Sequence, residues 1–163
     1  MALDAFIKID GIEGESTDSN HKGWIELISY YSDMTQTVSR TASSSGGASA
    51  ERVEFNGFGF TKLLDKASPL LALACAAGTH IGTIVLELCR AGGDKLTFMQ
   101  YTMRNCIISS IETSGTHGEN FPSEDLEIDF GQIEWRYTLQ KRAGGTAAGN
   151  IATGWNLEKN TRA

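Results

Sequence analysis

A short helix signal lies inside sequence that otherwise favours strands, and this contrast limits the folds open to the chain. The helical segment runs over Ser68–Ala77 and is followed by Gly78. We expect Ser68 to cap the helix and Pro69 to occupy its first turn, where a missing N–H costs nothing. Gly78 suits the left-handed position after the last turn. The spacing of apolar residues predicts a buried face made of Leu70, Leu73, Ala74 and Ala77.

The rest of the sequence favours β structure. Alternation and β-branched or aromatic content predict strands at residues 4–9, 24–31, 53–60, 80–89, 95–103, 106–113 and 126–139. In the last of these, the apolar phase changes at Gly131 and Gln132, which predicts a β-bulge. About eight strands and one helix favour a single domain over residues 1–163. A closed sheet, or two packed sheets, would remove its exposed edges.

One long segment interrupts the strand pattern. Residues 36–51 contain a run of small and polar residues with no apolar periodicity. Such a segment inside a compact domain is usually functional or disordered. We therefore expect a flexible extended loop at about 36–51, within the domain and not between two domains.

Composition restricts the classes of partner. The 163 residues include 14 Lys and Arg against 20 Asp and Glu, which gives a net charge of −6. This balance argues against binding to nucleic acid, which needs a basic surface. The three cysteines are Cys75, Cys89 and Cys106, an odd number placed in apolar elements, so we expect reduced core thiols and folding in a reducing cytoplasm. The N-terminus has no signal-peptide pattern and no segment reaches the length of a membrane helix, so we expect no membrane insertion.

No motif for catalysis or for a cofactor is present in the sequence. The three histidines, His21, His80 and His117, are scattered and have no metal-ligand spacing. There is no phosphate-binding loop and no nucleophile elbow. A spatial Ser/His/Asp arrangement stays open, because such residues need not be adjacent in sequence. We expect no catalytic residue, no metal, no cofactor and no enzymatic activity.

Several motifs in a fixed order give the chain a family resemblance. They are residues 7–16 (IKIDGIEGES), 21–23 (HKG), 58–62 (FGFTK), 65–69 (DKASP), 78–81 (GTHI), 90–93 (RAGG), 108–110 (ISS), 130–135 (FGQIEW) and 154–157 (GWNL). Each motif alone is weak, but together they cover nearly the whole chain. The sequence resembles the haemolysin-coregulated protein (Hcp) family of the bacterial type VI secretion system.

The resemblance implies a fold and a role. Members of this family resemble phage tail-tube proteins, which implies a mainly β chain: a closed barrel of two packed antiparallel sheets with one short helix at its side. It also implies a structural subunit of the secretion tube. Six copies would form a ring, stacked rings would form a hollow tube, and the lumen would carry or protect effector proteins. The implied partners are the chain itself, the sheath and the spike, and export would proceed from the cytoplasm to the outside or to a target cell without a signal peptide.

Three sets of residues are candidates for these contacts. The charged side of the last long strand suggests Glu134 and Arg136 for the interface between subunits. The family resemblance makes the loop an arm toward the next ring, with stacking candidates Arg40, Ser43, Ser44, Ser45, Gly46 and Gly47. Tyr31, on the strand before the loop, is either on the wall of the lumen in contact with cargo or a core residue.

Two other functions stay open from the sequence. One is a β-barrel that binds a small ligand or a carbohydrate, or a hydrolase built on such a barrel, and it would be monomeric. The other is the tail-tube protein of a phage-like particle, which has the same mechanics without exported cargo.

Overall fold

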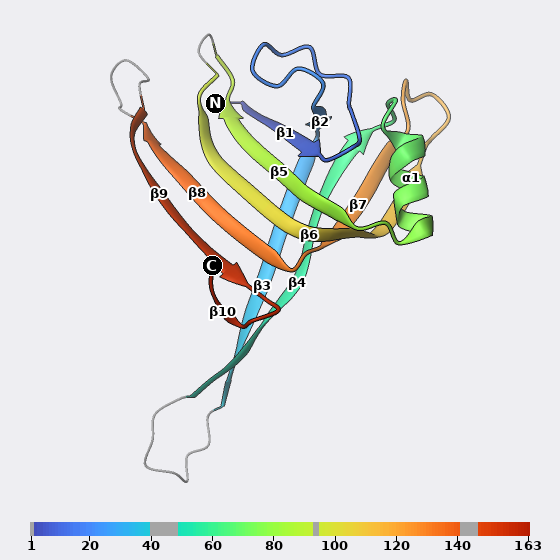
Figure 1. The fold of residues 1–163 in the computed structure, drawn as a ribbon. Coiled ribbons are helices and arrows are strands. Elements are labelled where there is room, and N and C mark those ends of the chain that lie inside the picture. Colours follow the sequence, from blue (N-terminus) through green and yellow to red (C-terminus); the bar gives the residue numbers. More distant parts are fainter. Residues whose placement is uncertain (1, 40–48, 93–94, 141–146) are drawn as a thin grey trace.

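Ten strands and one helix make up the described part of the chain in this computed structural model. The structure describes residues 2–39, 49–92, 95–140 and 147–163. The elements are β1 (Leu3–Ile9), β2 (Ile25–Leu27), β3 (Ser29–Ser39), β4 (Ser49–Leu63), α1 (Ser68–Ala77), β5 (Ile81–Arg90), β6 (Thr97–Ser114), β7 (Ser123–Asp129), β8 (Gln132–Gln140), β9 (Ala147–Asn156) and β10 (Thr161–Arg162). The predicted fold class, mainly β with antiparallel sheets and one short helix, is confirmed (Figure 1).

Two antiparallel layers enclose the core. Sheet A has the order β10-β9-β8-β6-β5-β1-β2, and sheet B has the order β3-β4-β7-β6. Strand β6 belongs to both: its first part pairs with β5 and β8, and its last part pairs with β7. On the other side of the body only Ile28 separates β2 from β3, and its N–H donates to the Thr61 carbonyl at 2.8 Å. Strand pairing alone leaves the sheet open there, so the expected barrel is not fully closed by hydrogen bonds, and the chain itself joins the two layers.

The corner within β6 merges two predicted strands into one. Asn105 has φ 54°, a left-handed conformation that Asn tolerates better than most residues. The N–H of Gly131 donates to the carbonyls of Arg104 and Asn105 at 3.0 and 3.2 Å. The predicted β-bulge at Gly131 is therefore wrong. The segment 126–139 is two strands, β7 and β8, and the chain passes from sheet B to sheet A between them.

Sheet A presents its core side as rows of side chains across successive strands. One row runs through Ile7, Leu86, Tyr101 and Trp135, which are register partners in turn. Aromatic rings of sheet B cover this row, with Phe58 against Tyr101 at 5.4 Å between centroids and Phe55 stacked on Trp135 at 6.5 Å. The core thus lies between the layers, with α1 at the side against β6 (Figure 1).

Helix α1 forms where the sequence predicts it but turns a different face inward. Gly78 ends the helix in the left-handed conformation, as expected. The cap residue is Ala67 and not Ser68, and the buried residues are Ser68, Leu71 and Ala74. Of the predicted buried face only Ala74 is buried: Leu70 and Leu73 are 47% and 62% exposed and Ala77 is exposed, so most of that prediction is wrong.

The remaining predictions on local structure have mixed outcomes. Cys89 and Cys106 are buried and Cys75 is partly buried, all three as free thiols, as predicted. The C-terminal segment returns to the body through β9, and the Leu157 N–H donates to the Gly131 carbonyl at 2.8 Å. The predicted strand over residues 24–31 is divided between β2 and β3. Within the described residues, no helix has the length and apolar character needed to cross a membrane.

Candidate functional site

Tyr31 lies on the outer side of sheet B and not in the core. It is 47% exposed, and its hydroxyl donates to Glu127 Oε1 at 2.6 Å. Its ring lies over Gly57 and Gly59: a Cβ at Gly59 would collide with the ring, and one at Gly57 would be in tight contact with it. The hydrogen bond to Glu127, partial burial and the charges of Glu127 and Asp125 raise the pKa of Tyr31 from 10.0 to about 12. The hydrogen bond and the contacts with the two glycines thus hold the ring against the exposed outer side of sheet B.

The surface around Tyr31 is acidic. We name it the sheet B outer face; its acidic residues, all exposed, are Asp33, Glu112, Asp125, Glu127 and Asp129. The register places them on the side opposite to the core residues Phe60 and Leu126. In the described part of the chain, none of the five forms an ion pair with Lys or Arg. This face carries a concentrated negative charge around one aromatic side chain.

The segment predicted as a loop is partly strand. β3 and β4 stay paired as far as Ser39 and Ser49, and Gln36 Nε2 donates to the Glu51 carbonyl at 2.6 Å. Figure 1 shows this two-stranded ribbon extending well beyond the rest of the molecule. The stacking candidates Arg40, Ser43, Ser44, Ser45, Gly46 and Gly47 lie outside the described residues.

The interface candidates Glu134 and Arg136 are both exposed on the outer side of sheet A. Glu134 Oε2 lies 3.5 Å from Arg104 Nη2, a loose surface pair. The intervening Trp135 points to the core side, so the predicted alternation along β8 holds. The structure thus places this pair on a different layer from Tyr31.

Sequence reasoning missed a buried ion pair that ties α1 to sheet B. Lys62 is fully buried, and its Nζ lies 2.7 Å from Glu124 Oε2 and 2.9 Å from Asp65 Oδ1. The Ser68 hydroxyl donates to the same Glu124 oxygen at 2.7 Å and accepts from the Asp65 N–H at 3.1 Å. Lys62 and Glu124 are direct register partners on β4 and β7. The sequence analysis selects Ser68 only as a helix cap. Its hydroxyl instead belongs to this hydrogen-bond network.

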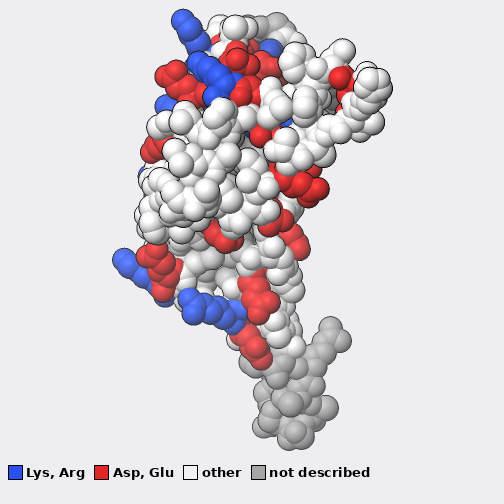
Figure 2. All heavy atoms as spheres, turned by 90° about the vertical axis from the view of Figure 1, so that its right-hand side faces the viewer, with Lys and Arg blue, Asp and Glu red and all other residues white. Residues whose placement is uncertain are grey.

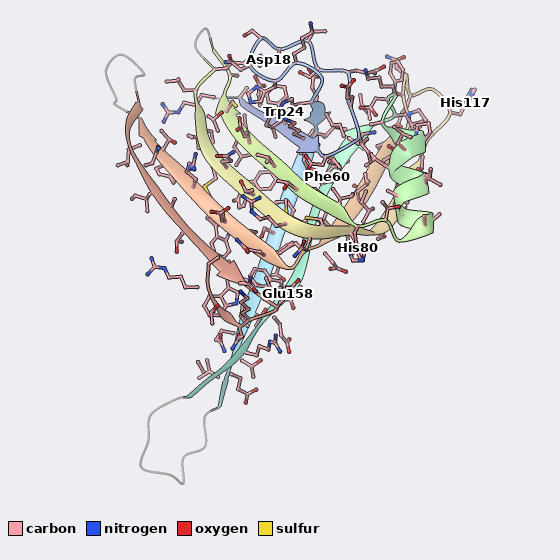
Figure 3. The ribbon with its side chains drawn as sticks, viewed as in Figure 1. Asp18, Trp24, Phe60, His80, His117 and Glu158 are labelled. Atoms are coloured by element: carbon pink, nitrogen blue, oxygen red, sulfur yellow. The ribbon has the colours of Figure 1, made fainter. Side chains whose placement is uncertain are left out.

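A second missed cluster surrounds His21. Its Nδ1 lies 2.8 Å from Asp18 Oδ1 and its Nε2 lies 2.7 Å from Glu87 Oε2. Its ring stacks on Phe6 at 4.2 Å and meets the edge of Trp24 at 4.9 Å. The hydrogen bond to His21, together with Lys95, lowers the pKa of Asp18 to about 2. The cluster fastens the loop after β1 to β5, while His80 and His117 lie far from it on the surface (Figure 3).

His21 and Glu87 also lie close to Cys89, so these three residues are a candidate set of metal ligands. One donor atom from each lies within 4.8 Å of the other two. Burial raises the pKa of the Cys89 thiol, and the Glu87 carboxylate raises it further, which opposes the thiolate that a metal needs. Both ring nitrogens of His21 already contact carboxylates. The arrangement fits a hydrogen-bonded anchor better than a metal centre.

Taken together, these features define a mainly β protein with an exposed acidic sheet face and a projecting ribbon. Comparison with known proteins gives the family. The family model described as "Type VI secretion system effector, Hcp" matches residues 6–137. Protein hcp1 of Pseudomonas aeruginosa is 34% identical over 164 residues, covering 100% of both chains.

Solved structures agree with this match. A structure described as a type six secretion system protein has a TM-score of 0.93 at 32% identity, covering 99% of this chain and 100% of that chain. Hcp1 from Salmonella typhimurium has a TM-score of 0.82 at 33% identity, covering 100% of both. The chain belongs to the Hcp family, and its role is that of a type VI secretion tube protein.

Proposed function

We propose that six copies of this chain form a ring, that rings stack into the secretion tube, and that the chain acts by shape and self-association without catalysis. The observation that carries this proposal is a pair of features on sheet B: the exposed outer face and the ribbon that projects beyond the body (Figure 1). A head-to-tail contact between two different patches closes into a ring when its rotation divides the circle.

The test of the ring is the mass and shape of the purified protein. Light scattering should give about six times the 17.6 kDa chain mass, and negative-stain images should show annular particles with an open centre. A mass near that of one chain at high concentration contradicts the ring and favours the monomeric ligand-binding barrel.

The ribbon is the proposed contact between stacked rings. Its described part exposes Met34 and Val38, each close to half, on an edge strand that pairs only with β4. Deletion of residues 43–48 should leave ring mass unchanged and reduce tube length in electron micrographs. Reversal of the same six residues, from SSSGGA to AGGSSS, is the matched control, because it keeps the length and the composition of the segment. Tubes of normal length after the deletion contradict a stacking role.

Tyr31 and the sheet B outer face are proposed to line the lumen and contact effector proteins. A photoreactive phenylalanine derivative at position 31 should crosslink to cargo when cargo and ring are purified together. The same derivative at Glu134, whose side chain is 48% exposed on the outer side of sheet A, is the control. Equal labelling of cargo from both positions contradicts a lumenal Tyr31.

Further proposed partners are the sheath and the spike of the secretion system. The proposed route is from the cytoplasm to the outside or to a target cell without removal of a signal peptide. Mass spectrometry of the exported protein should then recover the peptide that begins at the N-terminus of the chain. Recovery of only a shortened N-terminus contradicts this route.

A further inference from the structure

The sheet B outer face carries charge of one sign. Strands β3 and β7 contain no Lys or Arg, and neither does the part of β6 over residues 107–114. Of the two basic residues in β4, Lys62 is fully buried and Arg52 donates to the Leu157 carbonyl at 2.7 Å. Figure 2 shows the result on the side of sheet B, where acidic side chains follow one another down the right-hand edge toward the ribbon. In the described strands, no Lys or Arg side chain thus neutralises this face.

An aromatic ring stands on this face among short side chains. Tyr31 pairs with Gly59, which pairs in turn with Glu127 on β7. The neighbouring positions on the same side of the sheet carry short side chains: Ser29, Thr61 and Ser110. Tyr31 is exposed by nearly half, although its ring contacts the two glycines beneath it. Much of the ring surface is therefore open to a partner.

The hydroxyl end of the ring lies in a negative field. Tyr31 donates to Glu127 Oε1 at 2.6 Å, so a carboxylate lies at the rim of the ring. This hydrogen bond is the largest cause of the raised pKa of Tyr31, and the charges of Glu127 and Asp125 add to it. A field that opposes a phenolate stabilises a cation in the same place. A cationic side chain that lies on the ring therefore meets an aromatic face and a carboxylate together.

Arginine fits this arrangement better than lysine. Its planar guanidinium stacks on aromatic rings and donates to carboxylates as a fork, whereas an ammonium is a strongly hydrated point charge. Carboxylates flank Tyr31 on two strands: Asp33 lies two residues further along β3, and Glu127 lies across the sheet on β7. A guanidinium stacked on the ring thus has acceptors on both strands. The same charges repel an acidic partner such as nucleic acid.

We propose that the sheet B outer face selects cargo that exposes a cationic, arginine-rich segment, and that an arginine of this segment stacks on Tyr31. The inference rests on the proposed lumen and names the chemical class that the lumen holds. In a ring each copy repeats the same face, so the enclosed space carries one sign of charge from every side. A cavity lined in this way raises the local concentration of the opposite charge. Exposed ion pairs are individually weak and screened by salt, so cargo held by many of them can still leave.

Peptides of opposite charge test the chemical class. A fluorescein-labelled oligo-arginine peptide should bind purified rings in an anisotropy titration, and its affinity should fall about tenfold between roughly 50 and 200 mM salt, because exposed charges are screened. An oligo-glutamate peptide of the same length should not bind. Light scattering of the same samples reports whether the ring is present. Rings that bind neither peptide, or that bind both equally well, overturn the inference and leave the ring standing.

Two triple variants with the same change in net charge locate the binding surface. The face variant removes three carboxylates of the sheet B outer face and keeps Glu127: Asp33→Asn, Asp125→Asn and Asp129→Asn. The matched control removes three exposed carboxylates from other surfaces: Glu13→Gln, Glu26→Gln and Glu158→Gln. Oligo-arginine binding should weaken about tenfold or more in the face variant and stay within about twofold in the control. Equal weakening in the two variants overturns the assignment of this face.

Substitution of Tyr31 tests the stacking by itself. Tyr31→Leu should weaken oligo-arginine binding about twofold to fivefold and oligo-lysine binding less, because only the guanidinium stacks on the ring through its plane. Tyr31→Phe keeps the ring and should keep the preference for arginine. Equal losses for the two peptides in Tyr31→Leu overturn the stacking. A protein with the mass of one chain that still binds oligo-arginine at this face overturns the proposed ring, but not the charge class of the partner.

Discussion

The two ends of strand β4 obtain their interactions from different sources. At the Leu63 end, Lys62 is fully buried, and its ammonium contacts Glu124 and Asp65 of the same chain. At the other end, β4 pairs only with β3, whose Met34 and Val38 stay close to half exposed. A two-stranded ribbon alone is marginal in water. One strand thus joins a well-packed body to a ribbon that has few partners in the described part of the chain.

The largest expected effect on stability is at the Leu63 end of β4, where the strand belongs to the body. Glu124→Ala leaves the buried Lys62 ammonium without its closest partner, and we expect a loss of about 3–5 kcal/mol in the free energy of unfolding. Urea denaturation measures it. Glu134→Ala is the control, because its exposed pair with Arg104 should contribute about 0–1 kcal/mol. Equal losses in the two variants would contradict the assignment of Lys62–Glu124 as the anchor of this end.

The next largest effect is expected in α1, where a buried side chain can be compared with an exposed one. Leu71→Ala removes a fully buried side chain and should cost about 2–5 kcal/mol. Leu73→Ala changes a side chain that is 62% exposed and should cost within about 0.5 kcal/mol in the isolated chain. Thermal unfolding of both variants at a concentration where no ring forms gives the comparison. A larger loss of stability for Leu73→Ala than for Leu71→Ala would instead support the buried face that the helical spacing predicts.

A smaller effect lies midway along the strand pair, at Tyr31. Its folded pKa of about 12 exceeds the ordinary value of 10.0, so its hydroxyl contributes stability below pH 10. That contribution is lost as the pH rises from 10 to 12, because the unfolded chain releases this proton first. Tyr31→Phe should remove this dependence and one late step from the ultraviolet titration of tyrosines. An unchanged titration would show that the bond to Glu127 does not hold the proton.

The smallest effect on the isolated chain is expected at the projecting end. Met34→Ala and Val38→Ala should each change the free energy of unfolding by no more than about 0.5 kcal/mol, because both side chains are close to half exposed on a two-stranded ribbon. The same variants should shorten tubes, if the ribbon is the contact between rings. Urea denaturation and electron microscopy of the same samples separate the two roles. A stability loss comparable to that of Leu71→Ala would place the ribbon within the body instead.

Local patterns were sufficient for elements whose partners are close in sequence. The end of α1 at Gly78 and the strand after it were predictable, because a left-handed glycine and a period of two residues act locally. The break predicted at residues 104–105 coincides with Asn105, but β6 bends there without ending, so the two predicted strands are one. The predicted cap failed because the Ser68 hydroxyl contacts Glu124, which lies 56 residues away in the chain.

The sequence by itself determined the class of fold, the position of the helix and the family, since these follow from periodicity and from an ordered set of motifs. Only the tertiary structure decided which side of each element faces water. It buried Lys62 and His21, left Leu73 and Ile151 exposed, and placed Tyr31 on an acidic outer face. The physical reason is that burial depends on which layer covers a residue, and here sheet B covers only part of sheet A.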